Sequence, residues 1–318
     1  MFRQILLVLT STFSRLSRAA ILRAADSRLL RSVVDRYGMR LGAARFVAGE
    51  TLDECVPVLR RLNDVGLHAN TTLLGEAIPD AAGAAATVVE YEAIVERLAQ
   101  EGLRANIALK LTHLGLSFDQ QTAYHNLERI VAHAGRLGEF VRIDMEQSSF
   151  VDATLEIYEL LRRGGHENVG VVLQAYLYRS PADLERLLPL KPNLRVVKGA
   201  YLEPSTIAHP EKRDVDRAYV RLVERGLRGG AYVAVATHDE RIIRHVRAFA
   251  EREAISRDRF ELQMLYGVRP ALQRSVAAAG YKVLVATPFG PDWYPYLMRR
   301  LAERPANVLF FLRNLVRR

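Results

Sequence analysis

Short apolar segments alternate with longer segments of helical periodicity from residue 51 onward, and this alternation restricts the possible folds more than any other feature. The apolar segments, which we expect to be strands, span residues 67–74, 106–111, 140–145, 169–175, 194–198, 232–237, 260–265 and 282–286. The expected helices span residues 51–65, 82–100, 121–137, 149–163, 181–188, 215–228, 240–253 and 270–279. Strands and helices in this order predict an α/β fold, a closed (β/α)8 barrel of the TIM type.

The domain organisation follows from the lack of any Pro/Gly-rich or low-complexity seam between these segments. We expect an N-terminal helical arm, residues 1–45, followed by one barrel, residues 46–318. An open, doubly wound sheet is the alternative, but no GxGxxG motif follows the first strand. The first clear helix should begin with a capping box formed by Thr51 and Glu54.

Composition restricts the partners of the chain. Its 318 residues are 49% hydrophobic and carry a net charge of +9. Such basicity suits nucleic acid, a membrane surface or an anionic ligand, but no RNP, zinc-finger or helix-turn-helix motif is present, so we expect no nucleic-acid partner. Cys55 is the single cysteine, which excludes an internal disulfide and fits a reducing, cytoplasmic compartment. The histidines lack the spacing of metal ligands, so we expect no metal site.

Both ends of the chain combine apolar and basic residues. The apolar residues 5–9 are followed by several arginines before the first acid, Asp26, and the apolar residues 308–312 are followed by more arginines. Neither run approaches the ~20 residues of a membrane-spanning helix. Two interpretations stay open, namely helices that pack on the barrel and peripheral contact with the inner face of the cell membrane.

Polar residues lie at the C-terminal ends of the expected strands, where the active groups of a barrel gather. In chain order they are Glu76, Lys110, Asp144, Gln174, Arg195, Lys198, Thr237, His238 and Gln263, with Leu265 and Tyr266 beside them. Around Arg195, the pair Val196-Val197 suits a covered strand, and Gly199 allows a close approach of backbone or ligand. Each residue alone has an ordinary structural explanation, so it is their shared position that predicts a site.

A last helix should begin after Asp292, a suitable N-cap, and lie at the barrel mouth. Tyr296, Arg299 and Arg300 would share one face of this helix, because they are three and four residues apart. Two adjacent guanidinium groups can bind one carboxylate through paired hydrogen bonds, which lysine cannot do. The alternative is an ordinary basic surface helix.

A series of motifs also occurs in a recognisable order. They are Phe46-Val47-Ala48-Gly49-Glu50, Leu74-Gly75-Glu76, Leu109-Lys110-Leu111, Ile143-Asp144-Met145-Glu146, Val172-Leu173-Gln174-Ala175-Tyr176, Val197-Lys198-Gly199-Ala200-Tyr201, Ala236-Thr237-His238, Leu265-Tyr266-Gly267, and Tyr294-Pro295-Tyr296 with Arg299-Arg300. With these motifs the chain resembles, over residues 45–314, the proline dehydrogenase family of flavin-dependent barrel enzymes. The resemblance implies a distorted barrel, FAD as cofactor, and oxidation of L-proline to 1-pyrroline-5-carboxylate.

The resemblance also implies roles for individual residues. FAD would contact Met145, Gln174, Arg195, Lys198, Gly199, Ala200, Thr237 and His238, with Arg195 beside the flavin N5. The carboxylate of proline would be held by Lys110, Arg299 and Arg300, with Glu76 paired to Arg299. The ring would lie against Leu265 and Tyr296. Asp144 would orient Lys110 and, with Arg195, form the catalytic pair.

The implied mechanism is hydride transfer from the ring carbon beside the amine to the flavin, which then passes electrons to a membrane quinone. A fixed cation would stabilise the electron density that N5 gains. The substrate amine must be neutral, so activity should rise with pH until that amine is deprotonated. The basic, apolar ends of the chain would then serve peripheral membrane contact.

The chain departs from the family near the end of the eighth strand, where Ala286 stands in place of a common tyrosine. Loss of a phenol removes roughly 100 Å² of apolar contact and enlarges the pocket. Three functions therefore stay open: a proline dehydrogenase, a dehydrogenase of 4-hydroxyproline or another cyclic secondary amino acid, and a catalytically weak ligand-binding barrel. A class I aldolase that uses Lys198 as a Schiff base is a more remote alternative.

Overall fold

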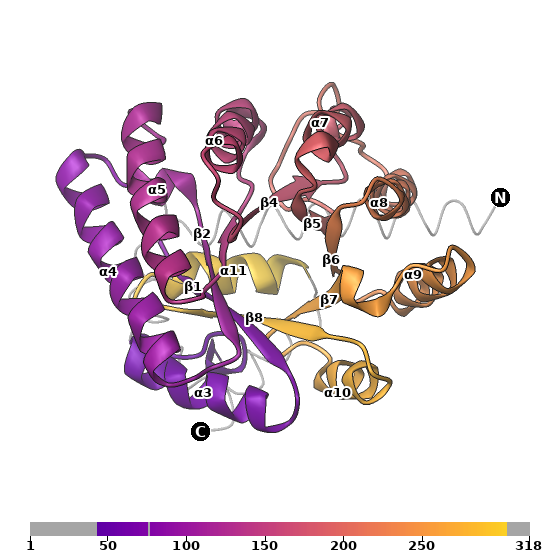
Figure 1. Cartoon of the computed structure of the whole chain (residues 1–318), viewed down its shortest axis with the longest axis horizontal. Helices are drawn as coiled ribbons and strands as arrows, with labels where there is room; N and C mark the ends of the chain where they lie inside the picture. Colours follow the sequence, from indigo (N-terminus) through magenta and orange to yellow (C-terminus); the bar gives the residue numbers. More distant parts are fainter. Residues whose placement is uncertain (1–42, 76, 304–318) are drawn as a thin grey trace.

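The structure, a computed structural model, describes residues 43–75 and 77–303 of the chain (Figure 1). The side chains of residues 299 and 301–303 lie outside this description. Most of the expected N-terminal arm, the apolar residues 308–312, Glu76 and the side chain of Arg299 are therefore outside the described residues. The described part begins with the short 3-10 helix η1 (Ala43–Arg45).

Eight parallel strands close into a barrel in chain order. They are β1 (His68–Leu73), β2 (Ala105–Leu109), β3 (Val141–Ile143), β4 (Val169–Gln174), β5 (Asn193–Val197), β6 (Tyr232–Ala236), β7 (Phe260–Leu265) and β8 (Val283–Phe289). Each strand pairs with the next, and β8 pairs with β1 from Leu284↔His68 to Phe289↔Leu73, which closes the ring. The predicted (β/α)8 barrel is confirmed, and the open sheet is excluded.

Helices follow the strands and surround them. They are α3 (Leu52–Asp64), α4 (Ala81–Gln100), α5 (Gln120–Arg136), α6 (Val151–Arg163), α7 (Ser180–Leu187), α8 (Lys212–Arg228), α9 (Glu240–Arg252), α10 (Pro270–Ala278) and α11 (Trp293–Glu303). Figure 1 shows α3 to α10 outside the ring of strands and α11 across its middle. Apolar faces of the outer helices pack on the strands and form one large core, as expected for this architecture.

The strand boundaries differ from the predicted ones mainly next to the polar residues. The second and third strands end at Leu109 and Ile143, earlier than predicted, because Lys110 and Asp144 leave the ladder. The eighth strand runs three residues further, to Phe289, although proline lacks the N–H that a ladder uses. The carbonyl of Pro288 instead accepts a hydrogen bond from the Ala48 amide at 2.8 Å, so the chain stays extended.

The start of α3 is stabilised by the predicted cap, with one difference. The Thr51 hydroxyl accepts a hydrogen bond from the Glu54 amide at 3.3 Å, as in a capping box. The Glu54 carboxylate, however, accepts from the amide of Glu50 at 2.7 Å rather than from that of Thr51. Gly49 makes this reach possible, since its φ is +138° and a Cβ there would lie 2.4 Å from Glu54.

A second, smaller hydrophobic cluster holds α11 at the barrel. It is formed by Ala43, Phe46, Val47, Leu74, Trp293, Tyr294, Leu297 and Met298, with Val268 and Tyr296 packed against it. The Trp293 indole also donates to the Glu50 carboxylate at 2.8 Å. Leu74 follows β1 and Val268 follows β7, so this cluster lies at the C-terminal ends of the strands. The last helix is therefore at the barrel mouth, as predicted.

The interior of the barrel carries charged and amide side chains instead of the branched apolar layers usual in this fold. Arg195 on β5 donates to Asn70 on β1, and in an eight-stranded ring these strands face each other, so the bond crosses the interior. Near the amino ends of the strands, Arg142 and Glu261 are both buried inside the barrel. Gly170 on β4 leaves the space for Arg142, because a Cβ there would lie 2.3 Å from its guanidinium.

Candidate active site

The C-terminal end of the barrel interior is open to solvent. Because side chains alternate along a strand, almost every strand has one inward-facing residue at its C-terminal end, and these residues are half-buried. The inward-facing residues two positions earlier on the same strands are mostly buried. The half-buried residues are Thr72, Lys110, Asp144, Val197, Ala236, Leu265 and Ala286. Half-buried side chains that point inward from a closed sheet lie at a solvent-exposed end of the barrel interior. The predicted site residues Lys110, Asp144, Leu265 and Ala286 are thus brought together.

Arg195 is the most constrained charge at this level. Its side chain is 7% exposed. One terminal nitrogen donates to the Asp144 carboxylate at 2.6 Å, and the other donates to the Asn70 amide oxygen at 2.7 Å. Its Nε is buried and has no hydrogen-bond partner among the described residues. The guanidinium is therefore held through both terminal nitrogens, and its Nε–H is a buried donor without a described partner.

Arg142 and Asn193 form a second polar contact directly below this one. Each lies two residues before Asp144 and Arg195 on β3 and β5, so the two pairs stack along the barrel axis. Arg142 donates to the Asn193 side-chain oxygen and, at 2.7 Å, to its carbonyl. Burial, together with the neighbouring charge of Arg195, lowers the pKa of Arg142 to about 10.

The segment after β2 positions Lys110. It turns into the 3-10 helix η2 (Leu111–Leu114), whose first turn is held by the buried Glu146. The Glu146 carboxylate accepts from the Thr112 amide at 3.0 Å and from the Thr112 hydroxyl at 2.6 Å. The Asp144 amide donates to the Leu109 carbonyl at 2.8 Å, which joins the ends of β2 and β3. The described hydrogen bond of the Asp144 side chain is with Arg195.

The residues predicted to form a carboxylate clamp are described only in part. Arg300 lies over the Tyr296 ring, with its guanidinium carbon 5.2 Å from the ring centroid. This contact confirms that positions four residues apart on α11 share a face. The side chain of Arg299 and the whole of Glu76 lie outside the described residues. Gly75 is fixed by its surroundings, because a Cβ there would lie 2.5 Å from the His113 imidazole.

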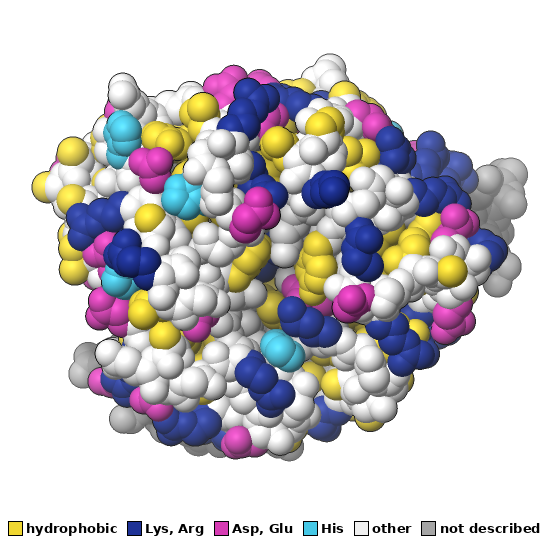
Figure 2. All heavy atoms as spheres, viewed as in Figure 1, with side chains coloured by type: hydrophobic (Ala, Val, Ile, Leu, Met, Phe, Trp, Pro, Cys, Tyr) yellow, Lys and Arg dark blue, Asp and Glu magenta, His cyan; other side chains and the backbone are white. Residues whose placement is uncertain are grey.

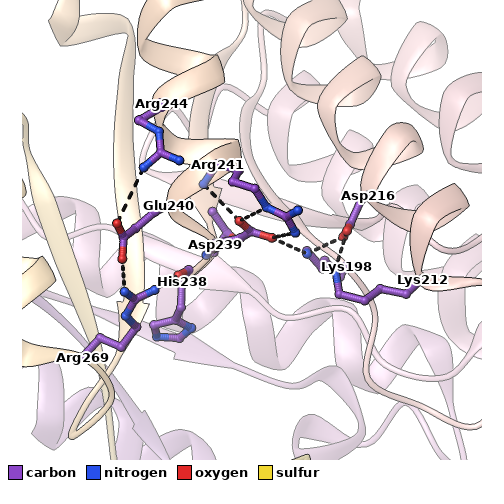
Figure 3. A network of polar contacts seen from close by, with 10 residues as sticks. Lys198, Lys212, Asp216, His238, Asp239, Glu240, Arg241, Arg244 and Arg269 are labelled. Atoms are coloured by element: carbon purple, nitrogen blue, oxygen red, sulfur yellow. Dashed lines mark hydrogen bonds and ion pairs between the residues drawn. The ribbon is translucent and has the colours of Figure 1, made fainter. Parts of the chain in front are cut away.

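Lys198, at the end of β5, joins a network of charges on the rim (Figure 3). It bonds Asp216 on α8, which also binds Lys212, and it lies 4.0 Å from Asp239. Although burial acts to raise it, the pKa of Asp216 is held below its usual value by hydrogen bonds from Lys198 and Lys212. Lys198 is therefore a paired ammonium group, unlike the isolated lysine that a Schiff-base enzyme uses.

Thr237 and His238 follow β6 and shape the same rim. The Thr237 hydroxyl accepts from the Asp239 amide at 3.1 Å, just before α9 begins. The His238 Nε2 accepts from the Leu265 amide at 2.9 Å, so this nitrogen carries no proton in that contact. Arg269 donates to the His238 carbonyl at 2.8 Å and also pairs with Glu240 (Figure 3). These bonds join the ends of β6 and β7.

Gly199 and Gln174 lie on adjacent strand ends. Gly199 has a φ of +112°, and a Cβ there would lie 2.2 Å from the Tyr176 ring, so both conformation and space require glycine. Gln174 is buried, and its amide nitrogen donates to the Met145 carbonyl at 3.4 Å. Its Oε1 is buried without a hydrogen-bond partner among the described residues. Ala200 is exposed beside them.

Sequence analysis missed Asn70 and Asn106, which join Arg195 in one hydrogen-bonded chain. Asn70 is 1% exposed. Its amide nitrogen donates to the side chain of Asn106 on the neighbouring strand β2. The one signal in the sequence was an asparagine inside each apolar segment, an unusual residue for a strand interior. Glu146 and Tyr176 lie within the motifs shared with the family, but no role was predicted for either residue.

The surface of the described part is mixed in charge. Figure 2 shows Lys and Arg side chains interspersed with Asp and Glu on the face in view, and hydrophobic side chains in small groups. Across residues 43–75 and 77–303, no helix is both long and apolar enough to cross a membrane. Within the same ranges, no three His, Cys, Asp or Glu side chains are arranged to hold a metal ion.

Comparison with known proteins gives a consistent result. The family model described as proline dehydrogenase matches residues 55–313. The chain is 40% identical over 301 residues to proline dehydrogenase 1 of Bacillus subtilis (strain 168), covering 95% of this chain and 99% of that protein. It is 41% identical over 307 residues to proline dehydrogenase of Deinococcus radiodurans, with the same shares covered.

A solved structure with a similar fold is proline utilization A (PutA) from Bdellovibrio bacteriovorus inactivated by N-propargylglycine. The TM-score is 0.78 at 24% sequence identity, and the match covers 91% of this chain and 36% of that one. At this identity the match supports the barrel fold and no more.

Proposed function

The chain belongs to the proline dehydrogenase family and oxidises proline, and from this premise we propose that FAD and proline meet in the open end of the barrel. The proposed product is 1-pyrroline-5-carboxylate. One observation supports this location above all others: two buried polar atoms at the mouth, Arg195 Nε and Gln174 Oε1, have no described partner. Buried polar atoms are almost always paired, so such atoms indicate a missing ligand.

The unpaired atoms suit a flavin in their hydrogen-bonding character as well as in their position. A flavin ring system offers both acceptors and an N–H donor, and this site offers one donor, Arg195 Nε, and one acceptor, Gln174 Oε1. Lys198, which also pairs with Asp216, is the cation on this rim that we assign to the phosphate groups. Gly199 and Ala200 bring backbone close to the same region. The proposed cofactor residues are Met145, Gln174, Arg195, Lys198, Gly199, Ala200, Thr237 and His238.

FAD, when bound, would supply the two-electron acceptor for a hydride from the ring carbon beside the amine. Arg195 is a fixed cation with a preset orientation, and it stabilises negative charge without reorganising. Asp144 and Asn70 hold it in that orientation. The interior charge of Arg142 adds to the same positive potential. We assign Asp144 and Arg195 as the catalytic pair on this basis.

The proposed substrate contacts divide by chemistry. Lys110, Arg299 and Arg300 bind the carboxylate, with Glu76 as the partner of Arg299, and Leu265, Tyr296 and Ala286 line the ring. The inward, half-buried position of Lys110 and the stacking of Arg300 on Tyr296 support this assignment. A cationic site at the rim orients the carboxylate outward and leaves the apolar ring inside the barrel.

A second substrate is supported by Ala286. It is half-buried and lies in register with Leu265 on β7 and Asn70 on β1, at the point where a larger side chain would narrow the mouth. A ring with a 4-hydroxyl group fits better beside a methyl group than beside a phenol. Oxidation of 4-hydroxyproline is therefore the second candidate activity.

The electron acceptor and the location in the cell complete the proposal. We assign a quinone as the acceptor and the cytoplasm as the compartment, with peripheral contact at the inner face of the cell membrane. Residues 1–45 would be the arm that makes this contact, and residues 46–318 the catalytic barrel. The basic, apolar sequence at both chain ends supports this division.

The test is anaerobic mixing of the FAD-loaded protein with L-proline and, separately, with trans-4-hydroxy-L-proline. Loss of oxidised-flavin absorbance is followed in time. Faster bleaching by L-proline supports the proposal, and faster bleaching by hydroxyproline makes Ala286 a specificity determinant. Protein that takes up no FAD, or flavin that neither substrate bleaches, contradicts it.

A further inference from the structure

Asn70 holds the Arg195 guanidinium from the opposite side of the barrel. The two residues lie on β1 and β5, and their hydrogen bond of 2.7 Å spans the interior. Asn70 is 1% exposed, so water does not compete for this bond. A polar side chain buried inside a strand is costly unless it is paired, and here both ends of the amide are paired.

The second contact of Asn70 sets the orientation of its amide. Its nitrogen donates to the side-chain oxygen of Asn106 and, at 3.5 Å, to the Asn106 carbonyl. Its oxygen therefore faces Arg195. A flipped amide would place two N–H groups against each other at Arg195 and two oxygens against each other at Asn106. Asn106 thus keeps Asn70 an acceptor toward the guanidinium.

The pair of partners at Arg195 is asymmetric in charge. Asp144 is a carboxylate and offsets part of the positive charge, whereas Asn70 accepts a hydrogen bond without adding charge. We propose that Asn70 is a positioning residue for the reaction, which fixes the plane of Arg195 and preserves its positive potential toward the flavin. This inference rests on the proposed function, because it takes Arg195 to act on bound FAD.

Three variants separate positioning from simple packing. Asn70→Asp keeps the shape and the acceptor but adds a negative charge, and Asn70→Leu keeps the volume but removes the acceptor. Thr71→Val is the matched control: it lies next to Asn70 on β1 and loses a buried hydrogen bond to the Thr287 carbonyl at 3.0 Å, on the outer face. Each variant is loaded with FAD and compared for flavin potential, FAD dissociation constant, kcat and KM.

The reduction potential of the flavin should distinguish the variants most clearly. In Asn70→Asp, the equilibrium between reduced and oxidised flavin should shift about tenfold toward the oxidised form, which is about 30 mV for a two-electron couple. Its kcat should fall by about tenfold or more while KM for proline changes little. The added negative charge weakens the electrostatic stabilisation by Arg195, and this stabilisation is stronger in the transition state than in the ground state. Asn70→Leu should weaken FAD binding and lower kcat with a smaller shift in potential. Thr71→Val should change only thermal stability.

The outcomes distinguish the inference from its premise. Wild-type values of potential and kcat in Asn70→Asp overturn the role of Asn70 and leave the proposed function intact. A shift in Thr71→Val equal to that in Asn70→Asp also overturns it, because the effect would then be structural. Wild-type protein that binds FAD but is not bleached by proline overturns the proposed function instead. Titration of the flavin potential with a redox dye does not need turnover, so it gives a value whether or not the protein oxidises proline.

Discussion

The two ends of the barrel interior are both charged, yet only one of them has the properties of an active site. At the amino ends, Glu261 binds Tyr232 at 2.8 Å, Lys282 at 2.9 Å, and Gln263. Arg142 is bonded to Asn193 in the same layer. The buried or half-buried groups named here, and the exposed Lys282, all have described partners within the protein. This end is therefore a closed polar network.

The carboxyl-end layer uses similar residues differently. Arg195 and Gln174 each keep one buried polar atom without a described partner, and the residues around them are half-buried. A closed network stabilises the fold, whereas an incomplete one is stable only when a ligand completes it. Buried charge is therefore present at both ends of the barrel interior, whereas the unpaired buried atoms of Arg195 and Gln174 lie at the carboxyl end.

The largest effect should follow from loss of the lysine at the mouth. Lys110→Met should lower kcat/KM for proline by about 10²- to 10³-fold, because a paired charge in a partly dry site contributes about 3–4 kcal/mol. Steady-state kinetics checks this, with FAD content and thermal stability expected to be unchanged. Lys191→Met, which changes an exposed lysine elsewhere, is the control. Equal kinetics in the two variants would remove Lys110 from the site.

A backbone change at the rim should come next. Gly199→Ala combines a φ of +112° with a clash against Tyr176, and a strain of about 1–3 kcal/mol should raise the FAD dissociation constant by about ten- to a hundredfold. Fluorescence titration of apoprotein with FAD measures this. Gly230→Ala has a comparable φ of +86° with open space around it, so it costs stability alone. Unchanged FAD affinity in Gly199→Ala would show that the rim at Gly199 does not bind the cofactor.

Narrowing the mouth should change selectivity. Ala286→Tyr should lower the ratio of kcat/KM for hydroxyproline to that for proline by about tenfold, in line with the 1–3 kcal/mol that one small group contributes in an apolar pocket. The assay compares both substrates on the same FAD-loaded preparation. A ratio that stays constant while both rates fall would mean that position 286 affects packing only.

The amino-end layer should respond in the opposite way. Glu261→Gln should lower the free energy of unfolding by about 1–2 kcal/mol, since a charged hydrogen-bonded contact is lost, and leave the proline kinetics close to wild type. Denaturant unfolding measures the first and turnover the second. A catalytic loss without a stability loss would contradict the division of the interior into two layers.

The pH dependence of unfolding tests the same residue. Burial acts to raise the pKa of Glu261, but the charge of Lys282 and hydrogen bonds from Lys282, Gln263 and Tyr232 hold it below the usual 4.5. A depressed folded-state pKa adds stability above the unfolded pKa, and this stability is lost as pH falls through the folded value. The difference between wild type and Glu261→Gln should therefore shrink as the pH falls below about 4.5. A difference that is independent of acid pH would contradict this role.

Sequence periodicity was sufficient for the architecture because each strand and helix is specified locally. All eight predicted strands are present, and their ends were wrong by more than one residue only where Lys110 and Asp144 leave the ladder or Pro288 continues it. The strand-end residues were also predictable, since the ends of parallel strands meet at one face. This explains why the residue pattern was enough to place Lys110, Asp144, Gln174 and Arg195 at one end of the barrel.

Contacts across the barrel could not be predicted in the same way. Asn70 and Arg195 are 125 residues apart, and their contact depends on β1 and β5 facing each other in a closed ring. The contact of Asn106 depends in turn on the orientation of the Asn70 amide, which the sequence does not specify. The reach of Glu54 to Glu50 instead of Thr51 depends on the φ of Gly49. Each of these details follows from three-dimensional closure or backbone conformation rather than from residue type.

The most direct test of the two-layer account is the anaerobic rate of flavin reduction by L-proline, measured by stopped flow in Arg195→Met and Glu261→Gln side by side. The account predicts a fall of about 10²- to 10³-fold in Arg195→Met, the usual effect of removing one preorganised charge-stabilising donor, and a rate near wild type in Glu261→Gln. Equal losses in both variants, or a wild-type rate in Arg195→Met, would contradict it.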